Sequence, residues 1–168
     1  ARAGIRLAFE SPKQLLDAVF ENRQVIATVD LPCHLNAIVN QYSEQQLTLQ
    51  NIIYKHTLFP IYAPFVPEAR RKQCIKWMGN ISQGSVHLSL GINASRVPII
   101  DRLRYCPQCL KEQAFQKGEF YWLSLWQIQG ACCPQHGNLV ESRLDLRSLH
   151  RHDFIAPSDV FCTEWNQV

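Results

Sequence analysis

The chain has 168 residues, 46% of them hydrophobic, and a formal net charge of +3 from 17 Lys and Arg against 14 Asp and Glu. This length and hydrophobic content are sufficient for one or two packed domains, which excludes an intrinsically disordered chain. The charge is only mildly basic, so it permits nucleic-acid binding without requiring it, because dedicated DNA-binding domains carry a stronger basic bias.

The sequence shows no membrane or secretion signal: no run approaches the ~18 apolar residues that cross a bilayer, and no signal peptide is visible. Its 7 cysteines are an odd number, which fits a reducing cytoplasm and a bound metal better than a secreted disulfide framework. The chain begins at Ala1 and residues 1–7 already have helical character, so we expect a fragment of a longer polypeptide, with no membrane partner.

The first half of the chain predicts helices. Ser11, Pro12 and Gln14 form a helix start, with a capping Ser, a Pro at the first helical position and a Gln that completes a capping box. This helix is predicted to end near Glu21. A second helix is predicted to open at Leu31-Pro32, directly after Asp30. Its apolar stripe consists of Leu35, Ile38, Val39 and Tyr42.

A third helix is predicted from Thr48 to Phe59, where Pro60 ends it. Three prolines between Leu58 and Pro67 then predict a stiff, extended connector, because proline disfavours helix at the preceding residue. The aromatic side chains of this connector, expected to plug a core, are Phe59, Tyr62 and Phe65.

A fourth helix is predicted to start at Pro67-Glu68 and to stop at Gly79-Asn80, with Cys74, Ile75 and Met78 facing inward. A short helix is predicted over Ser85 to Leu90. Amphipathic helices of this kind fit either a small bundle that fills its own core or a helix-turn-helix. Of the two, the residues alone favour the bundle.

Two short segments in the last third of the chain, called here the first and the second knuckle, have the spacing of a metal site. Cys106-Pro107-Gln108-Cys109 and Cys133-Pro134-Gln135-His136 each offer two soft ligands separated by two residues. Three thiolates and one imidazole form a closed tetrahedral set for a structural Zn²⁺, whereas a catalytic zinc keeps one position open. The long gap between the two segments suits a zinc-ribbon or treble-clef-like hairpin. We therefore predict one structural Zn²⁺ bound by Cys106, Cys109, Cys133 and His136.

Other residues offer alternative third and fourth ligands. Cys132 adjoins Cys133, and His150 and His152 lie downstream. Cys133 and His136 are preferred because one turn can present both side chains to one ion, and because Pro107 and Pro134 stiffen the two turns in matching positions.

The segment from Glu119 to Gln129 is strongly apolar and fits a strand or a short helix. Trp122 and Trp126 fit a base-stacking platform or, more favourably, the core that a small zinc module needs. After Leu139-Val140, basic residues recur every four positions. On a helix they would form a ridge, but interleaved acidic residues favour an ordinary solvated face. These basic residues are Arg143, Arg147 and Arg151.

Common enzyme signatures are missing: the sequence has no Gly-x-x-x-x-Gly-Lys-Ser/Thr phosphate loop, no Gly-x-Ser-x-Gly elbow and no His-Glu-x-x-His helix. The well-placed cysteines are better explained as ligands than as nucleophiles. We predict no enzymatic activity and no catalytic residues. A metal-dependent hydrolase with open coordination is kept as an alternative hypothesis.

Several runs of residues resemble the zinc-binding core of the TniQ family, and one upstream run resembles its TnsD branch. The core runs are Arg104–Leu110, Phe120–Trp122, Trp126–Gln127 and Cys133–Leu139, and the upstream run is His56–Phe65. Many TniQ relatives carry a second knuckle pair near the position of Cys162, which has no partner motif here.

The resemblance implies a selector of target sites in DNA transposition. Such a protein binds an attachment site in DNA and recruits an AAA+ ATPase regulator, and through it a transposase, without covalent chemistry of its own. It also implies a helix-turn-helix and a bacterial cytoplasmic, nucleoid-associated location. The alternative is a zinc-stabilised protein-interaction module with no direct DNA role.

The predicted fold is α+β and mainly α, with a helical domain over residues 1–100 followed by a zinc-binding module with a C-terminal extension over residues 101–168. Basic side chains are expected to hold DNA phosphates, although binding by this chain alone is expected to be weak and non-specific. The predicted phosphate contacts are Arg70, Arg71, Lys72, Arg102 and Arg104.

Overall fold

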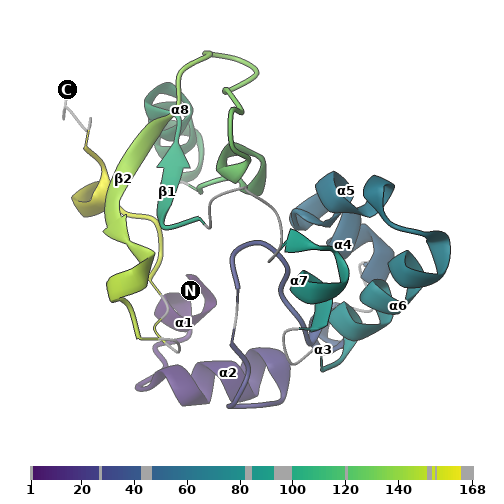
Figure 1. Ribbon diagram of the computed structural model, residues 1–168. Coiled ribbons are helices and arrows are strands. Elements are labelled where there is room, and N and C mark those ends of the chain that lie inside the picture. The colour runs from purple at the N-terminus through teal and green to yellow at the C-terminus, as the bar shows by residue number, and fades with distance from the viewer. Residues whose placement is uncertain are drawn as a thin grey trace. The chain divides into compact units, whose positions relative to one another are not determined.

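The structure, a computed structural model, describes residues 2–26, 28–42, 47–81, 85–92, 100–119, 121–150, 153 and 155–163. The chain divides into two compact units, residues 1–97 with 151–154 and residues 98–150 with 155–168. The described part is mainly helical, with one two-stranded sheet in the second unit (Figure 1). The predicted class, α+β and mainly α, is confirmed.

The first unit is built from short helices. In chain order they are α1 (Arg2–Arg6), α2 (Pro12–Phe20), α3 (Leu35–Gln41), α4 (Leu49–His56), α5 (Phe59–Tyr62), the 3-10 helix η2 (Ala63–Phe65), α6 (Glu68–Gly79) and α7 (Ser85–Ser89). Helices α3 to α7 surround one core, whose buried members include Leu35, Ile53, Phe59, Met78 and Val86. No helix of the described residues is long and apolar enough to cross a membrane.

The predicted start of α2 is confirmed. The Ser11 side chain accepts a hydrogen bond from the backbone N–H of Gln14, and the Gln14 side chain accepts one from the backbone N–H of Ser11. Pro12 occupies the first helical position, and Glu21 ends the helix in a left-handed conformation with φ 55°. Local capping chemistry therefore sets both ends of this helix.

The predicted start of the next helix at Leu31 is wrong, because α3 begins only at Leu35. Asp30 does not cap a helix. One of its carboxylate oxygens accepts the N–H of Leu31 at 2.7 Å, and the other lies 2.7 Å from His87 Nε2. His34, with φ 59°, then turns the chain into α3. Residues 31–34 are therefore held as a loop by partners that a helical periodicity does not reveal.

The predicted end of the third helix at Phe59 is also wrong. Helix α4 ends at His56, with Thr48 as its N-cap as predicted, and Thr57 is extended. The buried Thr57 hydroxyl donates to the Ile53 carbonyl at 2.6 Å and accepts the N–H of Phe59 at 3.1 Å. This hydroxyl, rather than Pro60, terminates α4 and starts α5.

The proline-rich segment is helical, so the predicted extended connector is wrong. Pro60 lies in the first turn of α5 and Pro64 in the first turn of η2, the positions at which a missing N–H removes no helical hydrogen bond. Among the expected aromatic plugs, Phe59 is fully buried, Tyr62 is half-buried and Phe65 is 84% exposed. Of the three aromatic side chains, Phe59 is the one fully buried in the core, where Ala63 of the same segment is buried as well and Tyr62 packs against it.

The predicted α6 is confirmed, with Pro67 before it and Cys74 and Met78 buried. Gly79 ends it against its neighbours: a Cβ there would lie 2.9 Å from Leu49 Cδ2 and 3.0 Å from Asn36 Nδ2. The short helix predicted over Ser85 to Leu90 is confirmed as α7, with Val86 fully buried.

The second unit pairs two antiparallel strands, β1 (Arg102–Tyr105) and β2 (Val140–Asp145), in the register Arg104 to Glu141 and Tyr105 to Val140. Between the strands lie α8 (Pro107–Lys117) and the 3-10 helix η4 (Ser124–Gln127). The 3-10 helices η5 (Leu146–Ser148) and η6 (Asp159–Phe161) follow β2. Figure 1 shows β2 beside β1, and α8 directly after β1.

Helix α8 was not predicted, although its signals are present. Pro107 occupies its first turn, Lys117 its last turn, and Gly118 ends it with φ 68°. These are ordinary start and stop signals. The segment Cys106–Cys109 is therefore the start of a helix rather than the turn that its ligand spacing predicts.

The core of the second unit explains the two tryptophans. Trp126 is 1% exposed, and the Trp122 ring stacks on Tyr105 with ring centroids 5.8 Å apart. The preferred interpretation as core is confirmed. Glu119–Gln129 is nevertheless neither strand nor fully buried, because among its described residues only 124–127 are helical and Leu125 is 60% exposed.

The basic ridge that a helix would have formed after the second knuckle is absent from the described residues, since Arg143 lies on β2 and Arg147 on η5. Arg147 forms ion pairs with Asp101 at 2.9 Å and Asp145 at 3.6 Å. The solvated-face interpretation fits these two residues, and Arg151 lies outside the described residues.

Candidate metal centre

The first knuckle is the junction between β1 and α8. Cys106 is extended and directly precedes the helix, while Cys109 lies in its first turn. Because residues three apart in this first turn face the same side, the two thiols converge. Both are buried, at 1% and 7% exposure. The local sequence thus presents two sulfur atoms from a rigid strand–helix corner.

The second knuckle is a tight turn closed by its own backbone. The N–H of Cys133 donates to the Gly137 carbonyl at 2.9 Å, and the N–H of Gly137 donates to the Cys133 carbonyl at 2.8 Å. Gly137 has φ 79°, a left-handed conformation that glycine adopts without a steric cost. This turn places the His136 ring on the same side as the Cys133 thiol.

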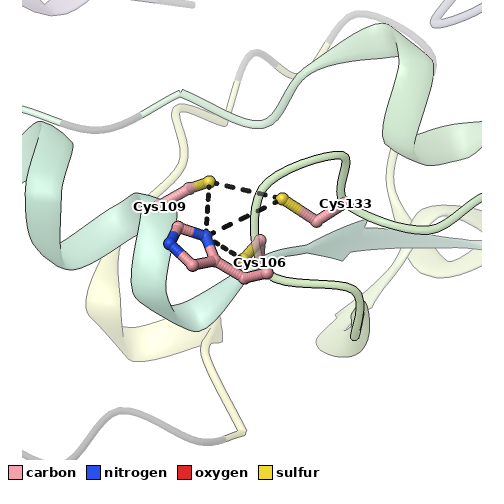
Figure 2. Close-up of side chains that lie close together, drawn as sticks. Cys106, Cys109 and Cys133 are labelled. Carbon is pink, nitrogen blue, oxygen red and sulfur yellow. Dashed lines mark hydrogen bonds between the residues drawn. The ribbon is translucent and has the colours of Figure 1, made fainter.

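The two knuckles meet, as Figure 2 shows for the three labelled cysteines. His136 Nδ1 lies 3.3 Å from Cys109 Sγ, 3.5 Å from Cys106 Sγ and 3.9 Å from Cys133 Sγ. The Sγ atoms of Cys109 and Cys133 are 3.5 Å apart. All pairs among the four ligand atoms lie within 4.8 Å, so the group could hold a metal ion.

These distances fit a tetrahedral zinc ion. Bond lengths of about 2.3 Å to sulfur and about 2.05 Å to nitrogen imply edges of about 3.8 Å between two sulfurs and about 3.6 Å between sulfur and nitrogen. The four contacts given above lie within a few tenths of an ångström of these edges. Three thiols and one imidazole are also donors that bind zinc well, whereas the hard cations calcium and magnesium prefer oxygen ligands.

The thiols of the cluster differ in acidity. Burial, together with the neighbouring thiols of Cys133 and Cys106, raises the pKa of Cys109. Burial also disfavours the thiolate of Cys133, but hydrogen bonds from the backbone of Gln135 and His136 outweigh it and lower the pKa of this residue. The cluster therefore mixes a readily ionised thiol with a strongly protonated one, and a bound cation would favour the thiolate at each.

The two alternative ligands that the structure describes, Cys132 and His150, lie outside the cluster. Among the described residues, the metal-sized group consists of Cys106, Cys109, Cys133 and His136. Cys132 is exposed, although its neighbour Cys133 is buried, and His150 is exposed as well. His152 lies outside the described residues.

One residue near the cluster was not singled out in the sequence. Glu112 Oε1 lies 3.2 Å from His136 Nε2, on the side of the ring away from the sulfurs. Glu112 follows Cys109 by three residues, so a prediction of α8 would have placed both on one face of the helix.

The predicted phosphate contacts on α6 are largely exposed. Arg71 pairs with Glu68, and Lys72 Nζ lies 3.6 Å from another oxygen of the same carboxylate. Arg70 is exposed. Burial raises the pKa of the Cys74 thiol, and the positive charge of Arg70 partly opposes this rise. Part of the positive charge on this helix is therefore already balanced by Glu68.

The predicted contacts on β1 differ from each other. Arg102 is exposed and lies opposite Asp145 in the sheet. Arg104 is half-buried, and its guanidinium donates a hydrogen bond to the Ile128 carbonyl. Its backbone is held as well, because the buried Gln127 amide accepts the Arg104 N–H at 2.7 Å and donates to the Arg104 carbonyl at 2.8 Å.

Comparison with known proteins adds two matches. The family model described as TniQ matches residues 1–139. The chain is 46% identical over 158 residues to the Transposon Tn7 transposition protein TnsD of Escherichia coli, an alignment that covers 93% of this chain and 31% of that protein. The chain thus spans about a third of the length of the curated relative that it matches.

Proposed function

Because this chain belongs to the TniQ family, whose model matches residues 1–139, we propose that it takes part in selecting the target site for DNA transposition. The observation that carries the proposal is the 46% identity to TnsD over 93% of the chain. In this role the chain contributes to binding an attachment site in DNA and performs no covalent chemistry.

The metal centre is proposed to hold one structural Zn²⁺. Bound to Cys106, Cys109, Cys133 and His136, the ion would supply a cross-link between the two knuckles. The strand–helix corner and the glycine-closed turn already orient their donors, and four protein ligands leave no position for a reacting water. The proposal is therefore scaffolding rather than hydrolysis.

A metal cross-link fits the modest core of the second unit. Its buried cluster includes three of the proposed ligands, Cys106, Cys109 and Cys133, packed with Tyr105, Leu110, Trp126 and Cys162. A core of this size supplies little stability by itself, so a small module of this kind needs an additional constraint. The two proposed domains, residues 1–100 and 101–168, would then differ in their dependence on metal.

For the helical domain we propose a helix-turn-helix among α3, α4 and α6, which pack on one another. Helix α6 would face DNA, since it carries Arg70, Arg71 and Lys72 on its accessible surface. Arg102 and Arg104 on β1 complete the proposed phosphate contacts, with Arg102 the more accessible of the two. Phosphate contacts of this kind position a protein without reading sequence.

The proposed partners are DNA, an AAA+ ATPase that regulates transposition and, through it, the transposase, in the nucleoid of a bacterial cytoplasm. The mild net charge and the pairing of Arg71 and Lys72 with Glu68 support weak, non-specific DNA binding by this chain alone. Its main contribution would then be a docking face for the ATPase.

A pull-down of the ATPase by the 168-residue chain, with and without attachment-site DNA, tests this proposal. Recruitment that DNA enhances supports target-site selection, and the same preparation should give only a weak, salt-sensitive gel shift. Recruitment of other proteins but neither ATPase nor DNA would instead support a zinc-stabilised interaction module. A tight, sequence-selective gel shift at near-physiological salt would contradict the proposed division of roles.

A further inference from the structure

The His136 ring is held between two kinds of partner. Its Nδ1 atom faces the three thiols at 3.3 to 3.9 Å, and its Nε2 atom lies 3.2 Å from Glu112 Oε1. A neutral imidazole carries one proton, so only one of its nitrogens can offer a lone pair to a metal. Either nitrogen of a histidine can bind zinc, and the partner of the other one decides which does.

Glu112 is well placed to make that decision. It is the one carboxylate in the sequence of α8, and it lies on the same helix as Cys109, one turn further along. An ionised carboxylate only accepts hydrogen bonds, so it selects the tautomer with the proton on Nε2 and leaves the Nδ1 lone pair directed at the sulfurs.

Two other polar side chains of the second unit contact other groups. Glu119 accepts the Tyr121 hydroxyl at 2.8 Å, and the Gln135 side-chain oxygen lies 3.5 Å from the Cys109 thiol rather than against the ring. The His136 side chain is 21% exposed whereas that of Glu112 is 53% exposed. Glu112 therefore reaches the ring from the solvent side, where its removal leaves the packed cluster in place.

We propose that Glu112 is the positioning residue of the metal centre: its carboxylate holds Nε2–H of His136 and presents Nδ1 to the metal. The inference rests on the proposed zinc site and adds a residue to it. The contact also joins the second knuckle to the helix of the first, so it brings the two halves of the ligand set together.

The test measures Zn²⁺ affinity of the 168-residue chain by competition with a chromophoric chelator. Glu112→Ala should weaken Zn²⁺ binding by about 10- to 100-fold, the usual effect of removing such a partner. Glu112→Gln keeps an accepting oxygen and should fall between wild type and Glu112→Ala. Gln116→Ala, an exposed position one turn along α8, is the matched control and should bind like wild type.

A second readout follows the ring itself. Long-range ¹H–¹⁵N NMR of the zinc-loaded protein should show His136 bound through Nδ1 with a proton on Nε2. Zinc on Nε2, or equal affinities for Glu112→Ala and Gln116→Ala, would overturn the role of Glu112 while leaving the zinc site intact. Failure of the wild-type chain to hold Zn²⁺ would overturn the zinc site and this inference together.

Discussion

His87 Nε2 donates to Asp30 Oδ2 at 2.7 Å, joining α7 to the loop before α3 across 57 positions of sequence. Both side chains are about three-quarters buried, at 25% and 23% exposure. The Asp30 carbonyl also accepts the N–H of Leu58 at 3.0 Å. One aspartate therefore ties three segments of the helical unit together.

This pair predicts a pH dependence of stability. The hydrogen bond that His87 donates to Asp30 raises the pKa of His87, although burial of the ring acts to lower it. Burial acts to raise the pKa of Asp30, but the hydrogen bond and the charge interaction with His87 outweigh burial, so the pKa of Asp30 is lowered. The His87 contribution is therefore complete below about pH 6.5 and is lost as pH rises through the raised pKa; the Asp30 contribution is complete above about pH 4 and is lost as pH falls.

Urea unfolding from pH 4 to 9 checks this. Near pH 6, His87→Gln should unfold with about 1–3 kcal/mol less free energy than wild type, the range for a hydrogen bond to a charged group. The difference should shrink as the pH rises through the raised pKa of His87, because the charged form of the ring is then lost. A difference that grows with pH would contradict the assigned ion pair. Comparing variants removes the effect of His34, whose pKa burial lowers.

Removal of the metal ligands should affect the two units unequally. Cys106→Ser, or a strong chelator, is expected to abolish cooperative unfolding of the second unit and leave the helical unit nearly unchanged, because metal-binding free energy is folding free energy in such sites. Cys132→Ser is the matched control, since this thiol is exposed beside the buried Cys133. Calorimetry measures the unfolding of each unit, and metal analysis measures the bound metal. Equal melting of wild type, Cys106→Ser and Cys132→Ser would refute the ligand assignment.

Thr57→Val should destabilise the helical unit by about 1–3 kcal/mol. Valine keeps the shape but removes the hydroxyl that donates to the Ile53 carbonyl and accepts the Phe59 N–H, so a buried N–H loses its partner. Denaturant unfolding gives the value. Thr48→Ala, which removes only the N-cap of α4, should cost about 1 kcal/mol, and an effect at Thr57 smaller than that at Thr48 would argue against its role in ending α4.

Gln127→Leu should destabilise the second unit even when metal is bound. The Gln127 side chain is buried and bonds to the Arg104 N–H, the Arg104 carbonyl and the Leu123 carbonyl. Leucine leaves the N–H and the carbonyl of Arg104 without these bonds, which costs roughly 2–4 kcal/mol, whereas the Leu123 carbonyl still accepts the N–H of Trp126. Thermal unfolding of the zinc-saturated protein measures the loss. Gln116→Ala on the exposed part of α8 should change little.

Charge changes on α6 should move DNA binding in opposite directions. Arg70→Ala should weaken the non-specific gel shift and reduce its salt slope by about 0.9, the value for one lost phosphate contact on duplex DNA. Glu68→Gln should tighten the shift, since it releases Arg71 and Lys72 from their shared carboxylate. Affinities measured across a salt series decide this, and an unchanged slope for Arg70→Ala would remove that residue from the interface.

Features that depend on neighbouring residues could be predicted from the sequence. The capping box at Ser11, the ends of α6 and the knuckle spacing each involve groups within four residues of one another, so local chemistry determines them. Errors arose where a remote or competing partner prevailed. Asp30 pairs with His87 instead of opening a helix, and the Thr57 hydroxyl ends α4 before Pro60 is reached.

The amino-acid sequence by itself determined the four candidate metal ligands, the mainly helical class and the resemblance to the TniQ family, because each is carried by residue type and short spacing. Only the tertiary structure decided that the two knuckles meet, that Glu112 contacts the far side of His136, and that Arg104 bonds to the Ile128 carbonyl. These contacts join residues far apart in the chain, and packing of the whole unit, not local preference, selects such partners.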